Sequence, residues 1–242
     1  MITTVANNVV AEQHVGLDIR SRTWAALEGA AVQRPLAVGA RPIFSAAKRT
    51  LDVLLALVAL ILIAPILVAV AIAVHLSSPG PVFFHQTRVG LHGRPFTCLK
   101  FRTMIKDAER VLELDPELGA SFVTCYKLKE DYRVTRVGAV LRKLSLDELP
   151  QFVNVLRGDM SLVGPRPVPA EELRHKYGPA GHVVVSVRPG LTGLWQVSGR
   201  STTTYEERVQ LDLSYVERRS PLMDTWIVIR TPIALLTMRG AH

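Results

Sequence analysis

Two adjacent acidic residues stand out in this sequence because a helix is predicted to begin at or just after them. Asp147 and Glu148 lie in a segment, residues 145–151, that reads Ser-Leu-Asp-Glu-Leu-Pro-Gln, and the apolar stretch that follows ends at Gly158. Glycine is suited to a helix C-terminus. The positive end of the helix dipole favours ionised carboxylates and attracts phosphate. The pair is therefore a candidate functional site that acts on a phosphate group.

The same residues also fit a structural role. Ser145 and Glu148 have the spacing of a capping box, in which the two side chains satisfy backbone N–H groups at a helix start. Pro150 argues against it, because it would fall fifth in that helix and remove a backbone hydrogen bond. A helix that starts at Asp147 or later places Pro150 in the first turn, where its missing N–H costs little. Spacing alone leaves both roles open.

A long apolar segment must help to position this pair. Residues 53–74 are 22 consecutive residues without a charged side chain. As a helix rising about 1.5 Å per residue they reach roughly 33 Å, which is enough for a bilayer core of about 30 Å. About fifty residues precede the run, which disfavours a secretory signal peptide. The sequence therefore predicts a membrane-bound protein.

Charge and proline placement bear on how this segment meets the membrane. Pro65 lies near its middle, and basic residues flank both ends, with Lys48 and Arg49 before it and others after it. The positive-inside tendency draws both flanks toward the cytoplasm. A re-entrant hairpin that returns to the same side satisfies both flanks, whereas a spanning helix leaves one of them outside. Charge placement leaves both arrangements open.

Composition narrows the choice of partners. The 242 residues carry a net charge of +8, from 29 Lys and Arg against 21 Asp and Glu. The basic residues do not form runs and lack interleaved aromatic stacks, which argues against nucleic acid and leaves an anionic membrane surface or phosphate-bearing substrates. Cys98 and Cys125 have no metal-ligand spacing, and reduced cysteines are consistent with a cytoplasmic catalytic face.

The predicted fold class is α+β, a mostly helical membrane-associated domain with a small β-hairpin and interfacial amphipathic helices. Strands are predicted at 82–86 and 95–101, an amphipathic helix at 205–217 and an apolar helix at 222–238. A membrane-interface helix and a core-packed terminal helix fit this last segment equally well. The expected regions are a weakly ordered extension (1–44), a re-entrant membrane helix (45–76), a cytoplasmic catalytic domain (77–220) and an interfacial C-terminal helix (221–242).

Six motifs, taken in order, resemble those of the monotopic phosphoglycosyl transferases, the bacterial sugar transferases that start lipid-linked glycan assembly. The resemblance covers roughly residues 48–241, and chance agreement at so many ordered sites is negligible. One motif is the acidic segment at 145–151. The others are Lys-Arg-x-x-Asp at 48–52, Gly-Pro-Val-Phe-Phe-x-Gln-x-Arg-x-Gly at 80–90, Lys-Phe-Arg-Thr-Met at 100–104, Ser-Leu-Val-Gly-Pro-Arg-Pro at 161–167 and Arg-Pro-Gly-Leu-Thr-Gly-Leu-Trp-Gln at 188–196.

The resemblance implies a reaction and a location. A UDP-sugar gives its sugar-1-phosphate to polyprenyl (undecaprenyl) phosphate, and UMP is released. In this family Asp147 is the nucleophile that forms a covalent phosphosugar intermediate, and Glu148 is its partner. Mg²⁺ is the implied cofactor, with Asp147 as its contact. The implied location is the bacterial inner membrane, with the catalytic domain facing the cytoplasm and a re-entrant helix broken at Pro65.

Basic residues supply the remaining candidate contacts to substrate and membrane. Arg166 lies between prolines and is a candidate phosphate clamp, because its planar fork pairs with phosphate oxygens. Lys48 and Arg49 are expected at the lipid headgroup level. Trp195 fits either a stack on uracil or a buried structural role. The other candidate substrate-binding residues are Lys100, Arg102, Arg188 and Arg200.

A rival hypothesis is a single-pass membrane scaffold protein without catalysis, in which changing Asp147 would leave function intact. The expected partners of the enzyme are a UDP-sugar, polyprenyl phosphate and membrane lipids, with no nucleic acid, and an oligomer is compatible with the sequence. A hexose-1-phosphate for exopolysaccharide synthesis is expected from the similarity to larger relatives. The residues themselves do not name the sugar, since specificity resides in small pocket differences worth about 1–3 kcal/mol each.

Overall fold

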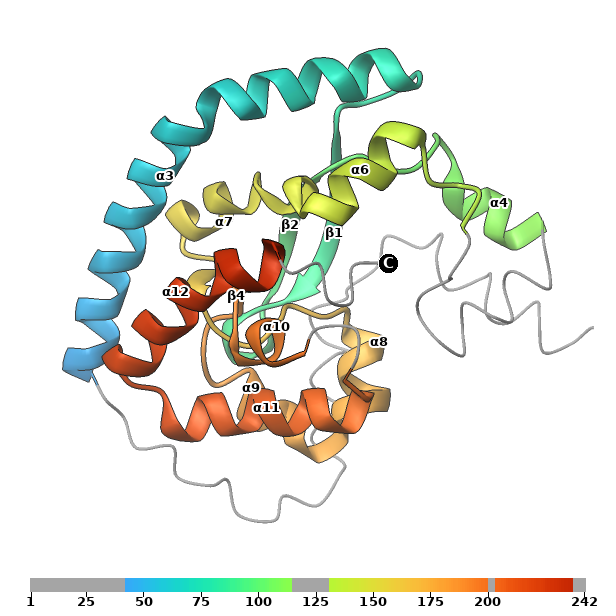
Figure 1. The fold of residues 1–242 in the computed structure, drawn as a ribbon. Helices are drawn as coiled ribbons and strands as arrows, with labels where there is room; N and C mark the ends of the chain where they lie inside the picture. Colours follow the sequence, from blue (N-terminus) through green and yellow to red (C-terminus); the bar gives the residue numbers. More distant parts are fainter. Residues whose placement is uncertain (1–41, 115–130, 200–202, 237–242) are drawn as a thin grey trace, which may run out of the picture. The chain divides into compact units, whose positions relative to one another are not determined.

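The computed structural model describes residues 42–114, 131–199 and 203–236, which all belong to one unit, residues 37–242. Almost all of the expected N-terminal extension lies outside the described residues. A long helix, α3 (Pro42–Ser77), is followed by a β-hairpin and a series of shorter elements (Figure 1). These are α4 (Ala108–Leu114), α6 (Arg136–Leu144), η2 (Leu146–Glu148), α7 (Gln151–Arg157), β3 (Ser161–Val163), α8 (Ala170–Glu172), η3 (Leu173–Tyr177), α9 (Gly181–Val184), β4 (Gly190–Thr192), α10 (Leu194–Ser198), α11 (Tyr205–Arg218) and α12 (Pro221–Leu236).

Helix α3 contains the apolar segment and is a single helix with Pro65 inside it. It bends partway along its length (Figure 1), as helices commonly do at an internal proline. Residues 44–77 are long and apolar enough to cross a membrane, and side chains in the middle, such as Ile61 and Leu62, are exposed. The two ends pack against one domain, the first half on α7 and β3 and the second half on α6. The predicted helix is confirmed, and its re-entry into the membrane stays a prediction.

A buried carboxylate attaches the first half of α3 to the domain. Asp52 is 5% exposed, and it accepts hydrogen bonds from Ser161 Oγ at 2.7 Å and from the Leu162 backbone N–H at 3.2 Å. Lys48 lies one helical turn before it, with Nζ 3.6 Å from Asp52 Oδ1 and 2.8 Å from Asp224 Oδ2 of α12. The Lys-Arg-x-x-Asp motif therefore joins α3 to β3 and α12.

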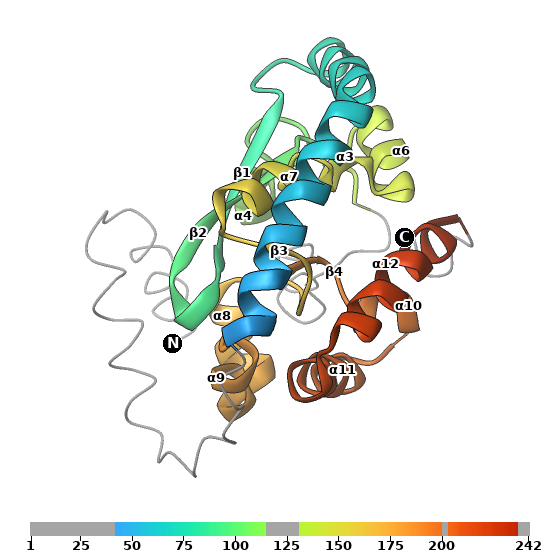
Figure 2. The ribbon, with the colours of Figure 1, turned by 90° about the vertical axis from the view of Figure 1, so that its left-hand side faces the viewer.

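The arginine of the same motif closes the C-terminal end of α7. Arg49 donates to the carbonyls of Val155 at 2.6 Å and Leu156 at 3.0 Å, in the last turn of the helix, where carbonyls lack intrahelical partners. The sequence predicted lipid headgroup contacts for Lys48 and Arg49. In the structure both have protein partners, because the first half of α3 lies against the domain (Figure 2).

The predicted hairpin is confirmed as β1 (Phe83–Val89) paired antiparallel with β2 (Pro95–Phe101). The other edge of β2 is covered by a buried side chain of α7. Asn154 donates from Nδ2 to the Thr97 carbonyl at 2.7 Å and accepts from the Leu99 N–H at 3.0 Å. Unpaired strand edges need such partners. This contact fixes the register between β2 and α7, which carry neighbouring parts of the site.

Two glycine-containing motifs meet in a parallel pair of short strands, β3 and β4, which the sequence did not predict. A Cβ on Gly190 would lie 2.1 Å from the backbone N of Gly164, and a Cβ on Gly164 would lie 2.5 Å from the Arg188 carbonyl oxygen. Only glycine permits this approach of two backbones. The close contact between these two backbones therefore fixes the start of the extended segment that carries Arg166.

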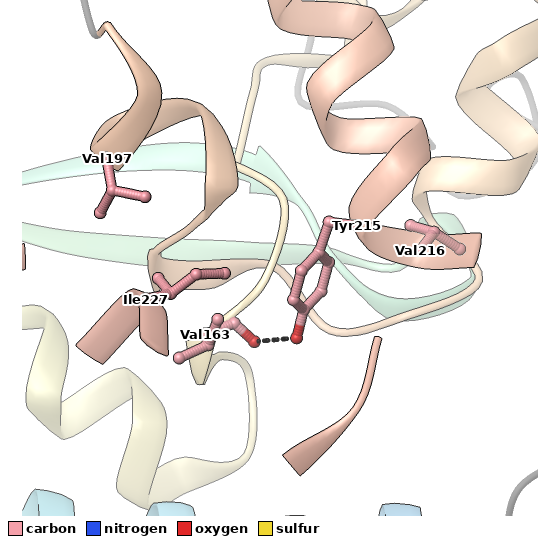
Figure 3. Packing of buried hydrophobic residues seen from close by; sticks show 5 residues of the cluster. All are labelled: Val163, Val197, Tyr215, Val216 and Ile227. Atoms are coloured by element: carbon pink, nitrogen blue, oxygen red, sulfur yellow. Dashed lines mark hydrogen bonds between the residues drawn. The ribbon is translucent and has the colours of Figure 1, made fainter. Parts of the chain in front are cut away.

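A hydrophobic cluster joins β3 to the C-terminal helices (Figure 3). Tyr215 of α11 is 1% exposed, and its hydroxyl donates to the Val163 carbonyl at 3.0 Å and contacts Asp224 at 2.9 Å. In α12, Ile227 is fully buried in this cluster, whereas Leu222 is 84% exposed. The terminal helix thus has one face in the core and one apolar face outside it. The first face agrees with a core-packed helix, and the second is compatible with a helix at the membrane interface.

We expect Asp52→Asn to lower the free energy of unfolding by about 1–3 kcal/mol, because a buried network loses its charged acceptor. The unfolding midpoint of the detergent-solubilised protein measures this effect. Glu217→Gln removes an exposed carboxylate from α11 and is the matched control. Equal midpoints for the two variants would contradict an anchoring role for Asp52.

Candidate active site

A pocket lies where β1, β2, η2, α7 and the segments that follow β3 and β4 meet. The side chains that line it include Arg88, Lys100, Glu148, Arg166 and Gln196. Four of these five are charged, and three of those four are basic. The sequence had placed Lys100, Glu148 and Arg166 in separate motifs, and the fold brings them together.

The acidic segment forms a turn between two helices. Ser145 ends α6 in the left-handed conformation (φ 55°), residues 146–148 form the 3-10 turn η2, and α7 begins at Gln151 with Pro150 as its N-cap. Ser145 makes no side-chain capping bond, so the capping-box alternative is wrong. The physical reason is that a helix capped by Ser145 would contain Pro150 in its interior, where proline has no N–H to donate. The predicted helix end at Gly158 is confirmed, with φ 91°.

Glu148 is held by two cations. Its Oε1 lies 2.7 Å from Lys100 Nζ and 3.3 Å from Arg166 Nη2. The interaction with Glu148 raises the pKa of the Arg166 guanidinium above its ordinary value. Lys100 reaches the acidic turn because the contacts of Asn154 hold β2 beside α7. The arrangement presents two cations to any anion that enters the pocket.

Asp147 is half-buried beside this cluster. Burial, followed by the negative charge of Glu148, raises the pKa of the Asp147 carboxyl to about 6. Lys100, Arg142 and Arg166 act in the opposite direction. The carboxylate is therefore mostly ionised at pH 7, which a carboxylate nucleophile requires. Arg142, in the last turn of α6, was not predicted, although its position five residues before Asp147 in the sequence was a usable signal.

Two predicted binding residues, Arg102 and Arg188, are not among the side chains that line the pocket. Arg102 is 7% exposed and donates to the Ser78 carbonyl at 2.6 Å, where the chain leaves α3. Strand β2 ends at Phe101, so Arg102 lies just beyond the strand that carries Lys100. Arg188 donates to the Gly158 carbonyl at 2.9 Å. Arg200 lies outside the described residues.

A second charged cluster backs the pocket, and sequence reasoning missed it. Glu172 lies 3.9 Å from Arg88 Nη1 and 3.3 Å from Arg208 Nη1, and it accepts a 2.6 Å hydrogen bond from the Tyr205 hydroxyl. Burial and the nearby charge of Arg166 lower the pKa of Arg88 to about 10. The motif at 80–90 contained Arg88, but nothing local in the sequence pointed to Glu172.

Helix α11, which carries Tyr205 and Arg208, also buries a carboxyl group next to this cluster. Asp212 is 1% exposed and accepts a 2.7 Å hydrogen bond from the Tyr177 hydroxyl of η3. Burial raises the pKa of Asp212 to about 6, while the bond from Tyr177 and the charges of Arg208 and Arg166 oppose the rise. Its protonated form is therefore stabilised in the folded state.

Most of this chain is similar to known proteins. The family described as bacterial sugar transferase matches residues 43–238. The exopolysaccharide production protein ExoY of Sinorhizobium fredii is 47% identical over 206 residues, which are 84% of this chain and 91% of that protein.

Two further relatives have names that state a reaction. The UDP-glucose:undecaprenyl-phosphate glucose-1-phosphate transferase of Caulobacter vibrioides is 44% identical over 202 residues, covering 81% of this chain and 72% of that protein. The undecaprenyl-phosphate galactose phosphotransferase of Salmonella typhimurium is 42% identical over 199 residues, covering 81% of this chain and 41% of that protein. The chain thus spans less than half the length of the Salmonella relative.

The pKa of Asp212 predicts a pH dependence of stability. Because its folded-state pKa of about 6 exceeds the ordinary 3.8, the stability that it contributes is complete below about pH 4 and is lost as the pH rises through 6. We expect Asp212→Asn, which cannot ionise, to lessen this decline. Unfolding midpoints of the wild type and the variant between pH 4 and 7.5 test the expectation. Parallel curves, offset by a constant, would contradict it.

Proposed function

The chain belongs to the bacterial sugar transferase family, and from this premise we propose that it transfers a sugar-1-phosphate from a UDP-sugar to polyprenyl phosphate with release of UMP. It is a phosphoglycosyl transferase, as its relatives are by name. The observation that carries the proposal is a pocket lined by Glu148 and two cations, with Asp147 next to Glu148 in the same turn. Such an arrangement suits a nucleophile that attacks a phosphate group.

The proposed reaction has two displacements. In the first, an oxygen of Asp147 attacks the phosphorus that bears the sugar, and the bond from that phosphorus to the bridging oxygen breaks, so that UMP leaves. In the second, a phosphate oxygen of the polyprenyl phosphate attacks the same phosphorus, and the bond to Asp147 breaks. The carboxylate is restored. Covalent catalysis of this kind lets the water-soluble and the lipid substrate react at different times.

The main obstacle to the first displacement is the repulsion between a carboxylate and a phosphate, and the nearby cations reduce it. Lys100 and Arg166 lie within 3.3 Å of Glu148 and near Asp147, and Arg88 lines the same pocket. They stabilise negative charge that develops on phosphate oxygens in the transition state. Glu148 balances Lys100 and Arg166 before substrate binds, and it keeps both side chains directed at the acidic turn.

Mg²⁺ is the proposed cofactor. Among the described residues no group of three or more His, Cys, Asp or Glu side chains could hold a metal. Mg²⁺ is commonly bound by one or two carboxylates together with substrate phosphates and water. The donor set of Asp147 with Glu148 fits this pattern, with Asp147 as the primary ligand. Bound there, the ion would supply charge neutralisation on the phosphate oxygens.

The packing of α3 supports a re-entrant membrane segment at the cytoplasmic membrane. Asp52 near one end and Val74 near the other are both buried against the same domain. A helix that crossed the bilayer would separate these ends by its thickness. A bent helix returns to its starting side, which brings the lipid substrate to a cytoplasmic catalytic face. The flanking basic residues agree with this topology.

The proposed sugar is a hexose, and the proposed role is the first membrane step of exopolysaccharide assembly. Glucose and galactose appear in the names of the Caulobacter and Salmonella relatives, and exopolysaccharide production in that of the Sinorhizobium relative. Among the described residues no observation favours the scaffold alternative.

We expect the solubilised protein, given polyprenyl phosphate, Mg²⁺ and a panel of UDP-sugars, to release UMP from one of them. Asp147→Asn should lower this rate at least about 10³-fold, because the amide is a poor nucleophile. Glu148→Gln should lower it less, because the nucleophile remains. UMP is measured against time, with omission of the lipid as a second control.

Release that persists in Asp147→Asn would remove that residue from its proposed role. Release without the lipid acceptor would indicate hydrolysis instead of transfer. Arg218→Lys, at an exposed position of α11, is the matched control for folding and expression and should retain the full rate.

A second prediction concerns the membrane topology. We expect single cysteines introduced as Ser45→Cys and Thr87→Cys, both at exposed positions on opposite sides of the apolar segment, to be labelled from the same face of the membrane. The parent protein would carry Cys98→Ala and Cys125→Ser. A membrane-impermeant maleimide should react with both in inside-out vesicles and with neither in intact cells. Labelling from opposite faces would show a spanning helix.

A further inference from the structure

Trp195, which follows β4 in α10, is the meeting point of two arginines. The guanidinium carbon of Arg166 lies 5.5 Å from the centroid of its ring, and that of Arg208 lies 4.7 Å from it. The indole N–H donates to Thr203 Oγ1 at 2.8 Å, which fixes the ring from its edge. A cation within about 6 Å of an indole is attracted by the ring's electrons. Trp195 is therefore in contact with a pocket residue and with a residue outside the pocket.

Arg208 is mostly buried outside the pocket, between a carboxylate and two aromatic rings. Its side chain is 12% exposed, it lies 3.3 Å from Glu172 Oε1, and its guanidinium carbon is 4.9 Å from the ring centroid of Tyr205. Tyr205 in turn donates to the same Glu172 oxygen at 2.6 Å. Glu172 neutralises Arg208, which would otherwise repel Arg166 across the shared ring. α8 and α11 thus support the indole from behind.

Arg166 depends on this support for its orientation. One contact of 3.3 Å to a single oxygen of Glu148 does not determine the plane of a guanidinium, and the segment that carries Arg166 has a proline on each side. Trp195 supplies a second contact, since the Arg166 guanidinium carbon lies 5.5 Å from its ring centroid, within the range of cation–π attraction. The plane matters because bidentate binding of phosphate requires both N–H groups to point at it.

We propose that Trp195 and Arg208 are positioning residues that set the plane of Arg166 for the phosphates of the nucleotide sugar. The inference rests on the proposed function, in which Arg166 binds those phosphates. Neither residue contacts the reacting atoms: Trp195 acts through Arg166, and Arg208 acts through Trp195. This assigns Trp195 a role different from a stack on uracil, because one of its contacts is already Arg166 and another is Arg208.

A double-mutant cycle between Trp195 and Arg166 tests the proposal. We expect Trp195→Leu to lower kcat/KM for the UDP-sugar about tenfold, and Trp195→Phe, which keeps a ring face, to lower it less than about threefold. In an Arg166→Gln protein, Trp195→Leu should have no further effect, since the group that it positions is gone. Arg208→Lys, which keeps the charge and loses the planar stack, should resemble Trp195→Leu, and Arg218→Lys on the same helix should resemble the wild type.

The same cycle is repeated with the Kd of UDP measured by calorimetry, which needs no turnover. Equal losses from Trp195→Leu in the wild-type and Arg166→Gln proteins would overturn the proposal and indicate general structural damage. No loss in either protein would overturn it as well. If the variants show the expected coupling in UDP binding, but the wild-type protein releases no UMP from any UDP-sugar, the proposed reaction is overturned and the positioning role is still supported.

Discussion

A buried carboxylate, Asp52, attaches the long helix α3 to the strand that leads into the site. It lies inside the helix that carries the apolar segment, yet it accepts hydrogen bonds from Ser161 and Leu162 at the start of β3. A charge removed from water is stable only with such partners. Because β3 leads through Gly164 directly to Arg166, the same contact connects the long apolar helix α3 to the part of the pocket that carries Arg166. The placement of α3 and the position of the site are thereby coupled.

Charge balance explains why the pocket is suited to phosphate. Glu148 is shared by Lys100 and Arg166, and Glu172 is shared by Arg88 and Arg208, so each carboxylate faces two cations. A surplus of positive charge remains on these side chains for an incoming anion. The same surplus keeps Asp147 mostly ionised at neutral pH, although burial and Glu148 raise its pKa. The net charge of +8 is therefore concentrated in part where the proposed chemistry needs it.

Local patterns predicted the elements well and the side-chain partners poorly. The hairpin, the helix that ends at Gly158 and the amphipathic helix α11 follow from periodicity, glycine and turn residues, which act within a few positions of the chain. Arg102 was expected to bind substrate, but it lies beyond the end of β2 and donates to the Ser78 carbonyl instead. Lys48 and Arg49 were expected at lipid headgroups, and they bind Asp224 and the end of α7.

The sequence by itself determined the long apolar helix, the acidic turn and, through ordered motifs, the family. Those features reside in runs and spacings, so no long-range contact is needed to read them. Only the tertiary structure decided that Lys100 and Arg166 share Glu148, that two glycines from separate motifs touch, and that Trp195 lies against Arg166 and Arg208. The physical reason is that these contacts join residues 13 to 48 positions apart along the chain. The energies of these contacts depend on distances in space, and a pattern along the sequence does not specify those distances.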